Sequence, residues 1–94
     1  MNKYETILII NPTLDEAECQ AVTDKFTDMI GKEGTVESTE AWGKRKLAYP
    51  IQKNNEGYYV HIDFSSNPEF IDELNRTYNI TDEIIKHIIV KKEN

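Results

Sequence analysis

Three runs of residues arrange their apolar side chains as β-strands do. Residues 3–10 end in four consecutive apolar residues, which is typical of a strand buried in the middle of a sheet. A last strand is expected from Ile84 to about Lys91. Residues 58–64 alternate strictly, which predicts one face on the core and one open face. The core face would carry Tyr58, Val60, Ile62 and Phe64, and the open face Tyr59, His61 and Asp63.

A fourth strand is expected from Thr35 to about Leu47, where β-favouring residues are mixed with polar ones. Its low hydrophobicity indicates an edge strand, and Gly43 is a candidate for a β-bulge. Pro50 and residues 54–57 are expected to form the turn into the next strand. Residues 44–53 are therefore predicted to be a flexible hairpin arm between two strands.

The first of two predicted helices has apolar residues at helical spacing between Leu14 and Ile30. It is expected to begin at Thr13, because Glu16 three residues later completes a capping-box pattern. Gly31 and Gly34 are expected to end it. The apolar stripe consists of Leu14, Ala17, Ala21, Val22, Phe26, Met29 and Ile30.

The second helix is expected to begin at Asn67-Pro68 and to stop near Asn79, with Phe70, Ile71, Leu74 and Tyr78 on its apolar face. The resulting order, β-α-β-β-α-β, is that of ferredoxin-like domains. Right-handed crossovers would place both helices on one face of a four-stranded antiparallel sheet, in the order 4-1-3-2. We therefore predict an α+β fold and a single domain spanning residues 1–94, a length that suits one two-layer core.

The chain carries a formal net charge of −6, but its charges are unevenly distributed. Residues 12–42 hold eight acidic side chains against two basic ones, and residues 54–94 hold eight against four. Residues 44–53 contain no acid and four bases, Lys44, Arg45, Lys46 and Lys53. This asymmetry suggests that a polyanion approaches the middle segment while the acidic helices face away from it.

Aromatic residues flank the basic block, Trp42 before it and Tyr49 within it. A basic arm with aromatic neighbours can contact phosphates and stack on bases. The alternative interpretation of the arm is a solvated loop. Trp42 also has two interpretations: an interface hot spot for a partner protein, or an aromatic side chain that covers the sheet edge.

The sequence gives little support to an enzyme. It contains no serine–histidine–aspartate or cysteine–histidine set, no glycine-rich phosphate loop and no metal-binding spacing. His61 and His87 would lie on strands separated by a third, with backbones about 9–10 Å apart, which is too far for easy joint metal binding. The single cysteine, Cys19, is expected to be a half-buried structural thiol in a reducing cytoplasm. No catalytic residue, metal or cofactor is predicted, and no apolar run is long enough for a membrane span.

RNA-recognition-motif domains share this order of elements and stack bases on aromatic side chains of the third strand. Gly57-Tyr58-Tyr59-Val60 begins like their Gly-aromatic-x-aromatic pattern, but a valine stands at the second ring position. Tyr58 also shares its face with the predicted core. Base stacking across the open sheet is therefore not favoured.

Several motifs distributed over nearly the whole chain resemble a single family. They are Lys3-Tyr4-Glu5, Asn11-Pro12, the block Trp42-Gly43-Lys44-Arg45-Lys46-Leu47-Ala48-Tyr49-Pro50-Ile51 with Lys53, Gly57-Tyr58-Tyr59, and the segment from Asn79-Ile80-Thr81-Asp82 to Val90-Lys91. On these motifs the chain resembles ribosomal protein six of the bacterial small subunit. The resemblance implies a structural, cytoplasmic ribosomal protein without enzymatic activity or cofactor. It also implies a protein that pairs with ribosomal protein eighteen and binds the central domain of small-subunit rRNA during assembly.

We expect the rRNA contacts to centre on Lys44, Arg45, Lys46, Tyr49 and Lys53, with Lys3, Tyr4, Lys86, His87 and Lys91 as secondary candidates. Trp42 is the candidate contact for the partner protein. Because an acidic domain is repelled by RNA, binding should be weak unless a basic partner offsets the field. The remaining alternatives are a ligand-sensing or other non-RNA interaction module and an enzyme, and the sensing module predicts no association with ribosomes.

Overall fold

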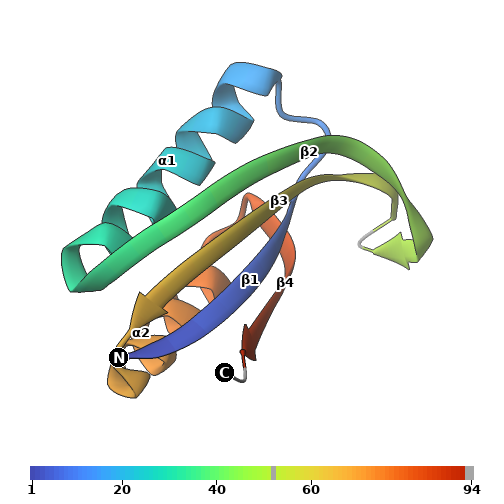
Figure 1. The fold of residues 1–94 in the computed structure, drawn as a ribbon. Coiled ribbons are helices and arrows are strands. Elements are labelled where there is room, and N and C mark those ends of the chain that lie inside the picture. Colours follow the sequence, from blue (N-terminus) through green and yellow to red (C-terminus); the bar gives the residue numbers. More distant parts are fainter. Residues whose placement is uncertain (52, 93–94) are drawn as a thin grey trace.

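The computed structural model describes residues 1–51 and 53–92. Its elements follow the predicted β-α-β-β-α-β order (Figure 1). They are β1 (Asn2–Ile10), α1 (Glu16–Glu33), β2 (Gly34–Ile51), β3 (Asn54–Ser66), α2 (Pro68–Asn79) and β4 (Ile84–Lys91). No helix among the described residues combines the length and apolar character needed to cross a membrane.

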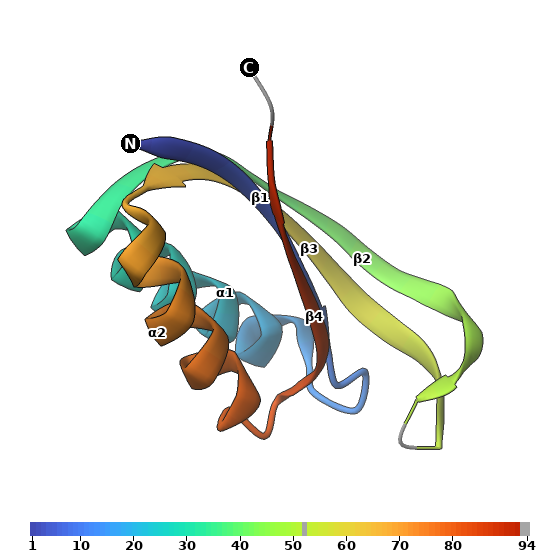
Figure 2. The same ribbon diagram turned by 90° about the horizontal axis from the view of Figure 1, so that it is seen from below.

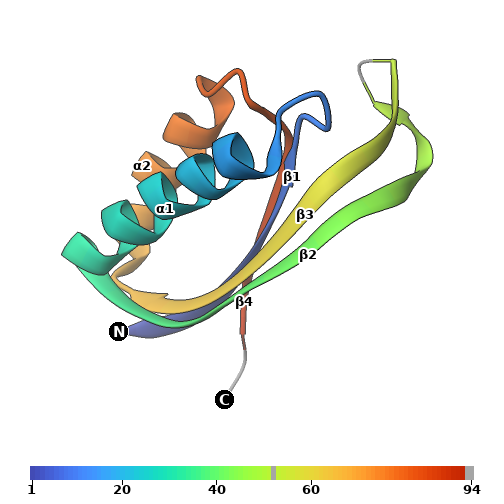
Figure 3. The same cartoon turned by 90° about the horizontal axis from the view of Figure 1, so that it is seen from above.

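The four strands form one sheet in the order β2-β3-β1-β4, and every neighbouring pair is antiparallel. This confirms the predicted topology, with the first and third strands in the centre. Both helices cover the same face of the sheet, and the other face is left open (Figures 2 and 3).

The main core lies between the helices and the covered face of the sheet. The predicted alternation of β3 is confirmed, because Tyr58, Val60, Ile62 and Phe64 are all buried there. Phe26 of α1 meets Tyr78 of α2 with ring centroids 4.7 Å apart, and both rings are buried. Cys19 is fully buried rather than half-buried, and burial raises the pKa of its thiol.

The start of α1 was predicted wrongly. The helix begins at Glu16 with Asp15 as its N-cap: a carboxylate oxygen of Asp15 accepts a hydrogen bond from the Glu18 N–H at 2.8 Å. Glu18 Oε1 accepts in return from the Asp15 N–H at 3.5 Å, which completes a capping box. Thr13 instead donates its hydroxyl to Asn11 Oδ1 in the preceding turn. Two capping-box patterns overlap in this sequence, and the one that starts with the stronger aspartate cap is used.

Gly31 does not end α1, which continues to Glu33, so that prediction is also wrong. Gly34 is the C-cap and its N–H donates to the carbonyl oxygen of Ile30. A Cβ at position 34 would collide with the backbone of Ser65, because β2 begins here against β3. The predicted bounds of α2 and β4 are confirmed.

The largest difference from the prediction lies in the connection between β2 and β3. β2 continues past Leu47 to Ile51, and β3 already begins at Asn54, so residues 54–57 form a strand instead of a turn. The predicted bulge at Gly43 is confirmed by a register shift between Ala41 and Gly43. Gly43 has a φ of 78°, in the left-handed region that glycine adopts at little cost.

Candidate nucleic-acid interface

The basic block lies on a hairpin that projects beyond the sheet. β1 pairs with β3 only from Asn2 opposite Ser66 to Ile10 opposite Tyr58. Among the described residues, the part of β3 before Tyr58 pairs only with β2, and both strands continue past β1 and bend at their distal end (Figures 1 and 2). We call residues 44–51 and 53–57 the distal hairpin.

The hairpin arm expected from the sequence is a paired two-stranded ribbon. The ladder joins Lys44 to Tyr58, Arg45 to Gly57, Lys46 to Glu56, and Ile51 to Asn54. Apolar side chains explain why it is ordered: Leu47 is 6% exposed and packs with Ile9 and Ile85 on the open face. A Cβ on Gly57 would collide with the side chain of Ile9, so glycine allows this close approach.

All four basic side chains of the block are exposed, but they do not share one face. Lys44 lies opposite the buried Tyr58 and lines a shallow pocket with Glu16 at the start of α1. Arg45 points to the other face, where its Cζ lies 6.0 Å from the centre of the Trp42 ring and its Nε donates to the Trp42 carbonyl. Alternation along the strand returns Lys46 to the side of Lys44. The bases therefore surround the hairpin instead of forming one flat patch.

Tyr49 and Lys86 connect the distal hairpin to β4. The Lys86 Nζ donates to the Tyr49 hydroxyl oxygen at 2.9 Å and lies 5.3 Å from the ring centre. This hydrogen bond raises the pKa of Lys86. Beneath the pair lies a cavity of about 200 Å³, lined by Ile7, Ile9, Leu47, Ala48, Tyr49, Ile51, Tyr59, Lys86 and Ile88. Of the secondary candidates, Lys86 is the one that joins the basic hairpin.

The other secondary candidates lie elsewhere. Lys3 and Lys91 are exposed at the opposite end of the sheet, where Lys3 pairs with Ser65 and Lys91 pairs with Tyr4. Tyr4 is only 6% exposed and its ring stacks on Phe64 with centroids 5.6 Å apart, which makes it a weak candidate for an RNA contact. Tyr4 shares the covered face with Phe64 because both follow the alternation of the core strands.

His87 faces the helices instead of the open face of the sheet. A ring nitrogen lies 2.6 Å from Asn75 Oδ1, and the ring centroid lies 4.9 Å from that of Tyr78. Burial at this position lowers the pKa of His87. A histidine whose charged form is disfavoured by burial, and which is hydrogen-bonded to α2, is a weak candidate for a phosphate contact.

Trp42 lies over the open face of the sheet, as its interpretation as a covering aromatic side chain expects. Its ring stacks over His61 at 5.5 Å and over Tyr59 at 6.3 Å on the open face, and its Nε1 donates to a carboxylate oxygen of Glu40. It still exposes 39% of its surface, which leaves area for a partner. Tyr58, the first ring position of the recognition-motif pattern, is buried on the helix side and has no face free for a base.

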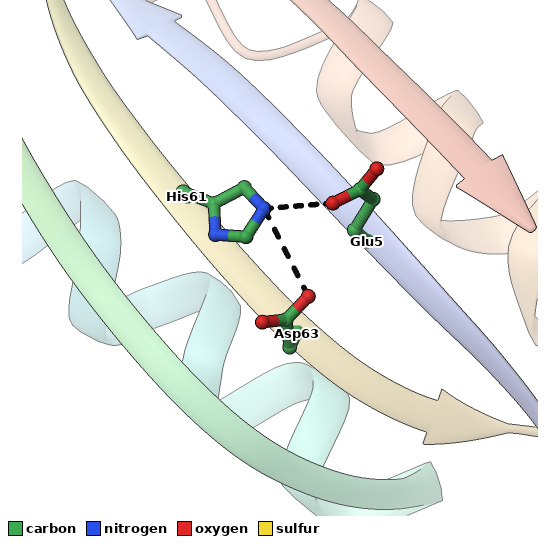
Figure 4. Close-up of side chains that lie close together, drawn as sticks. All are labelled: Glu5, His61 and Asp63. Carbon is green, nitrogen blue, oxygen red and sulfur yellow. Dashed lines mark hydrogen bonds and ion pairs between the residues drawn. The ribbon is translucent and has the colours of Figure 1, made fainter. Parts of the chain in front are cut away.

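Sequence reasoning missed a polar cluster on the open face (Figure 4). His61 Nε2 lies 3.0 Å from Glu5 Oε2 and 3.8 Å from Asp63 Oδ1, and Lys92 Nζ lies 2.6 Å from the same Asp63 oxygen. The lysine lowers the pKa of Asp63, and the aspartate raises the pKa of Lys92. The alternation of β3 placed His61 and Asp63 on one face, but only the pairing register brings Glu5 opposite Asp63.

The comparison with a family model agrees with this architecture. The model for "Ribosomal protein S6" matches residues 3–91. "Small ribosomal subunit protein bS6" of Clostridium perfringens strain SM101 is 54% identical over 94 residues, which is 99% of both chains. The protein of the same description from Clostridium novyi strain NT is 50% identical over 94 residues, with the same coverage.

A solved structure shows the same fold. The crystal structure of 30S ribosomal protein S6 from Thermotoga maritima superimposes with a TM-score of 0.92 at 32% sequence identity. The alignment covers 97% of this chain and 87% of that chain. The family match, the full-length relatives and the shared fold together establish that this chain belongs to the ribosomal protein S6 family.

Proposed function

We propose that this protein is a structural constituent of the bacterial small ribosomal subunit, where it binds the central domain of the rRNA together with ribosomal protein eighteen during assembly. The observation that carries the proposal is a projecting hairpin with four exposed bases on a protein of net charge −6. Family membership supports the same assignment, because its relatives are small-subunit proteins by name.

The RNA contacts we propose are phosphate contacts by Lys44, Arg45, Lys46 and Lys53, with Tyr49 and Lys86 packing beside them. A two-stranded ribbon with bases on both faces suits insertion between two backbones better than docking on one flat surface. Phosphate contacts fix register and orientation without reading sequence. RNA sequence would thus matter mainly through the shape of the site that the hairpin enters.

The acidic body makes a basic partner necessary. Exposed carboxylates lie on both helices, for example Glu16 and Asp24 on α1 and Asp72 on α2. Their repulsion of RNA limits affinity for the protein alone, and a basic partner would offset it. Linkage then requires that each protein raises the RNA affinity of the other by the same factor. The partly exposed Trp42 is our proposed anchor for that partner.

The direct test is a salt titration of rRNA binding in the presence of the partner protein. Replacing Arg45 by Ala should weaken binding and reduce the slope of log affinity against log salt by about 0.7–0.9, since one phosphate contact is lost. The matched control is Lys32→Ala, which removes one exposed positive charge from the last turn of α1. That variant should keep the full slope.

Sedimentation supplies an independent test. The protein should migrate with small subunits in a sucrose gradient at low salt. Recovery only in the soluble fraction, together with ligand-dependent thermal shifts, would favour a metabolite-sensing module instead. Tight binding of rRNA by the protein alone at physiological salt would contradict the proposed dependence on a partner.

A further inference from the structure

The polar cluster on the open face has the composition of a metal site. We propose that Glu5, His61 and Asp63 bind one divalent transition-metal ion of the zinc class. The three side chains come from the two central strands and point toward one another (Figure 4). One ligand atom from each lies within 4.8 Å of the other two. This site is separate from the proposed phosphate contacts of the distal hairpin.

The spacing of the three donors fits a tetrahedral ion. Zinc–ligand bonds of about 2.0–2.2 Å place neighbouring ligands roughly 3.3–3.6 Å apart. The observed distances from His61 Nε2, 3.0 Å to Glu5 Oε2 and 3.8 Å to Asp63 Oδ1, lie on either side of that value. For these two distances, adjustments of a few tenths of an ångström would reach the tetrahedral spacing, and a fourth position would remain for water.

The surrounding residues hold two of the donors in place. Ser38 donates its hydroxyl to Asp63 Oδ2 at 3.0 Å, which leaves Oδ1 turned toward His61. The Trp42 ring lies over the imidazole at 5.5 Å with an interplanar angle of 10°. Partners that orient ligands in this way raise the affinity of a metal site.

Electrostatics also favour a cation here. Glu5 and Asp63 are directly opposite in the β1–β3 register, an arrangement in which like charges repel. Asp63 Oδ1 is buried and accepts no well-aligned hydrogen bond from the described residues, although Lys92 Nζ forms an ion pair with it at 2.6 Å. The Lys92 ammonium group thus occupies a position where the neighbouring carboxylates attract a positive charge. Lys92 follows the end of β4 and is 39% exposed, so its side chain can swing out to admit an ion.

The donor set indicates which ions would bind. One imidazole nitrogen with two carboxylates suits zinc, cobalt and nickel, whereas magnesium and calcium prefer oxygen ligands alone. Two carboxylates also neutralise the charge of a divalent ion. We therefore expect zinc to bind at neutral pH and magnesium to compete poorly.

The test uses the untagged full-length chain. Zinc affinity is measured by competition with a chromophoric chelator, and cobalt or nickel binding by quenching of the fluorescence of Trp42, the only tryptophan. One equivalent should bind, and His61→Gln or Glu5→Gln should each weaken zinc binding at least about ten-fold. The matched control is His87→Gln, which removes the other histidine and should leave affinity unchanged.

Lys92→Met provides the opposite test. Removing the competing ammonium should strengthen zinc binding several-fold, whereas a purely structural ion pair would show no gain. Melting curves establish that each variant is folded. Zinc binding that is unchanged in both His61→Gln and Glu5→Gln, binding that depends on His87, or no saturable quenching of Trp42 by cobalt or nickel would overturn the proposal.

Discussion

The body of the sheet and the distal hairpin are built on different principles. In the body, residues 58–66 of β3 are paired on both sides, and their core-facing side chains are covered by both helices. In the distal hairpin each strand pairs with a single described neighbour, and Leu47 and Gly57 are its buried residues. The body carries most of the acidic charge, while the distal hairpin carries four of the eleven bases.

Because of this difference, stability and RNA binding are expected to depend on different residues. Body residues hold the fold through buried apolar area, and the exposed bases of the hairpin contribute little to it. The two properties meet at the base of the hairpin, where Leu47 and Gly57 pack against Ile9. As a member of a ribosomal protein family, the chain is a structural protein and not an enzyme. Its proposed interaction surface can therefore project from the fold without having to enclose a substrate.

The largest effect is expected in the body, from Phe64→Ala. The Phe64 ring is fully buried and stacks on Tyr4, so truncation should cost about 3–5 kcal/mol of unfolding free energy. Urea unfolding measures the loss. The control is Ile80→Ala, an apolar residue that is 74% exposed and should shift stability by less than about 0.5 kcal/mol. Equal losses in the two variants would contradict the assignment of the core.

The same comparison explains what the sequence could predict. In the body, periods of two and 3.6 residues identify strands and helices, because one face of each element must be buried. The distal hairpin gives a weaker signal: Lys44, Arg45 and Lys46 are polar on both faces, and the alternation of Leu47, Tyr49 and Ile51 after them is short and interrupted by Pro50. Leu47 is ordered by contacts with Ile9 and Ile85, which lie far away in sequence.

The candidate sites divide in the same way. The four bases of the hairpin could be predicted from local charge, and all are exposed. Which base lies on which face could not, because that depends on the bulge at Gly43 and on the pairing of β2 with β3. The cluster of Glu5, His61 and Asp63 requires the register of two strands that are more than fifty residues apart, which no local pattern provides.

A smaller effect, at the base of the hairpin, is expected from Leu47→Ala. Leu47 belongs to a small cluster with Ile9 and Ile85, so the loss should lie near the lower end for buried leucines, about 2 kcal/mol. RNA affinity with the partner present should fall as well, because the ribbon loses its contact with the sheet. The neighbouring variant Lys46→Ala should weaken RNA binding with nearly unchanged stability. Thermal melts and rRNA titrations on the same samples would separate the loss of stability from the loss of RNA affinity. A Leu47→Ala variant with unchanged RNA binding would show that the hairpin is ordered by RNA instead of by the sheet.

The smallest effect on stability is expected at the hairpin turn, from Lys53→Gly. Lys53 has a φ of 68°, a left-handed conformation that costs a lysine roughly 1 kcal/mol and glycine almost nothing. Glycine also loosens the unfolded chain, so the net gain should stay below about 1 kcal/mol. Amide exchange should slow locally in the hairpin while global unfolding hardly changes.

RNA binding by the Lys53→Gly variant should weaken even though the hairpin is stabilised. The salt slope should fall by about 0.7–0.9, because the variant loses one phosphate contact. Lys53→Asn is the matched control, since asparagine tolerates this φ and also removes the charge. If both variants keep the full slope, Lys53 shapes the turn and does not contact RNA.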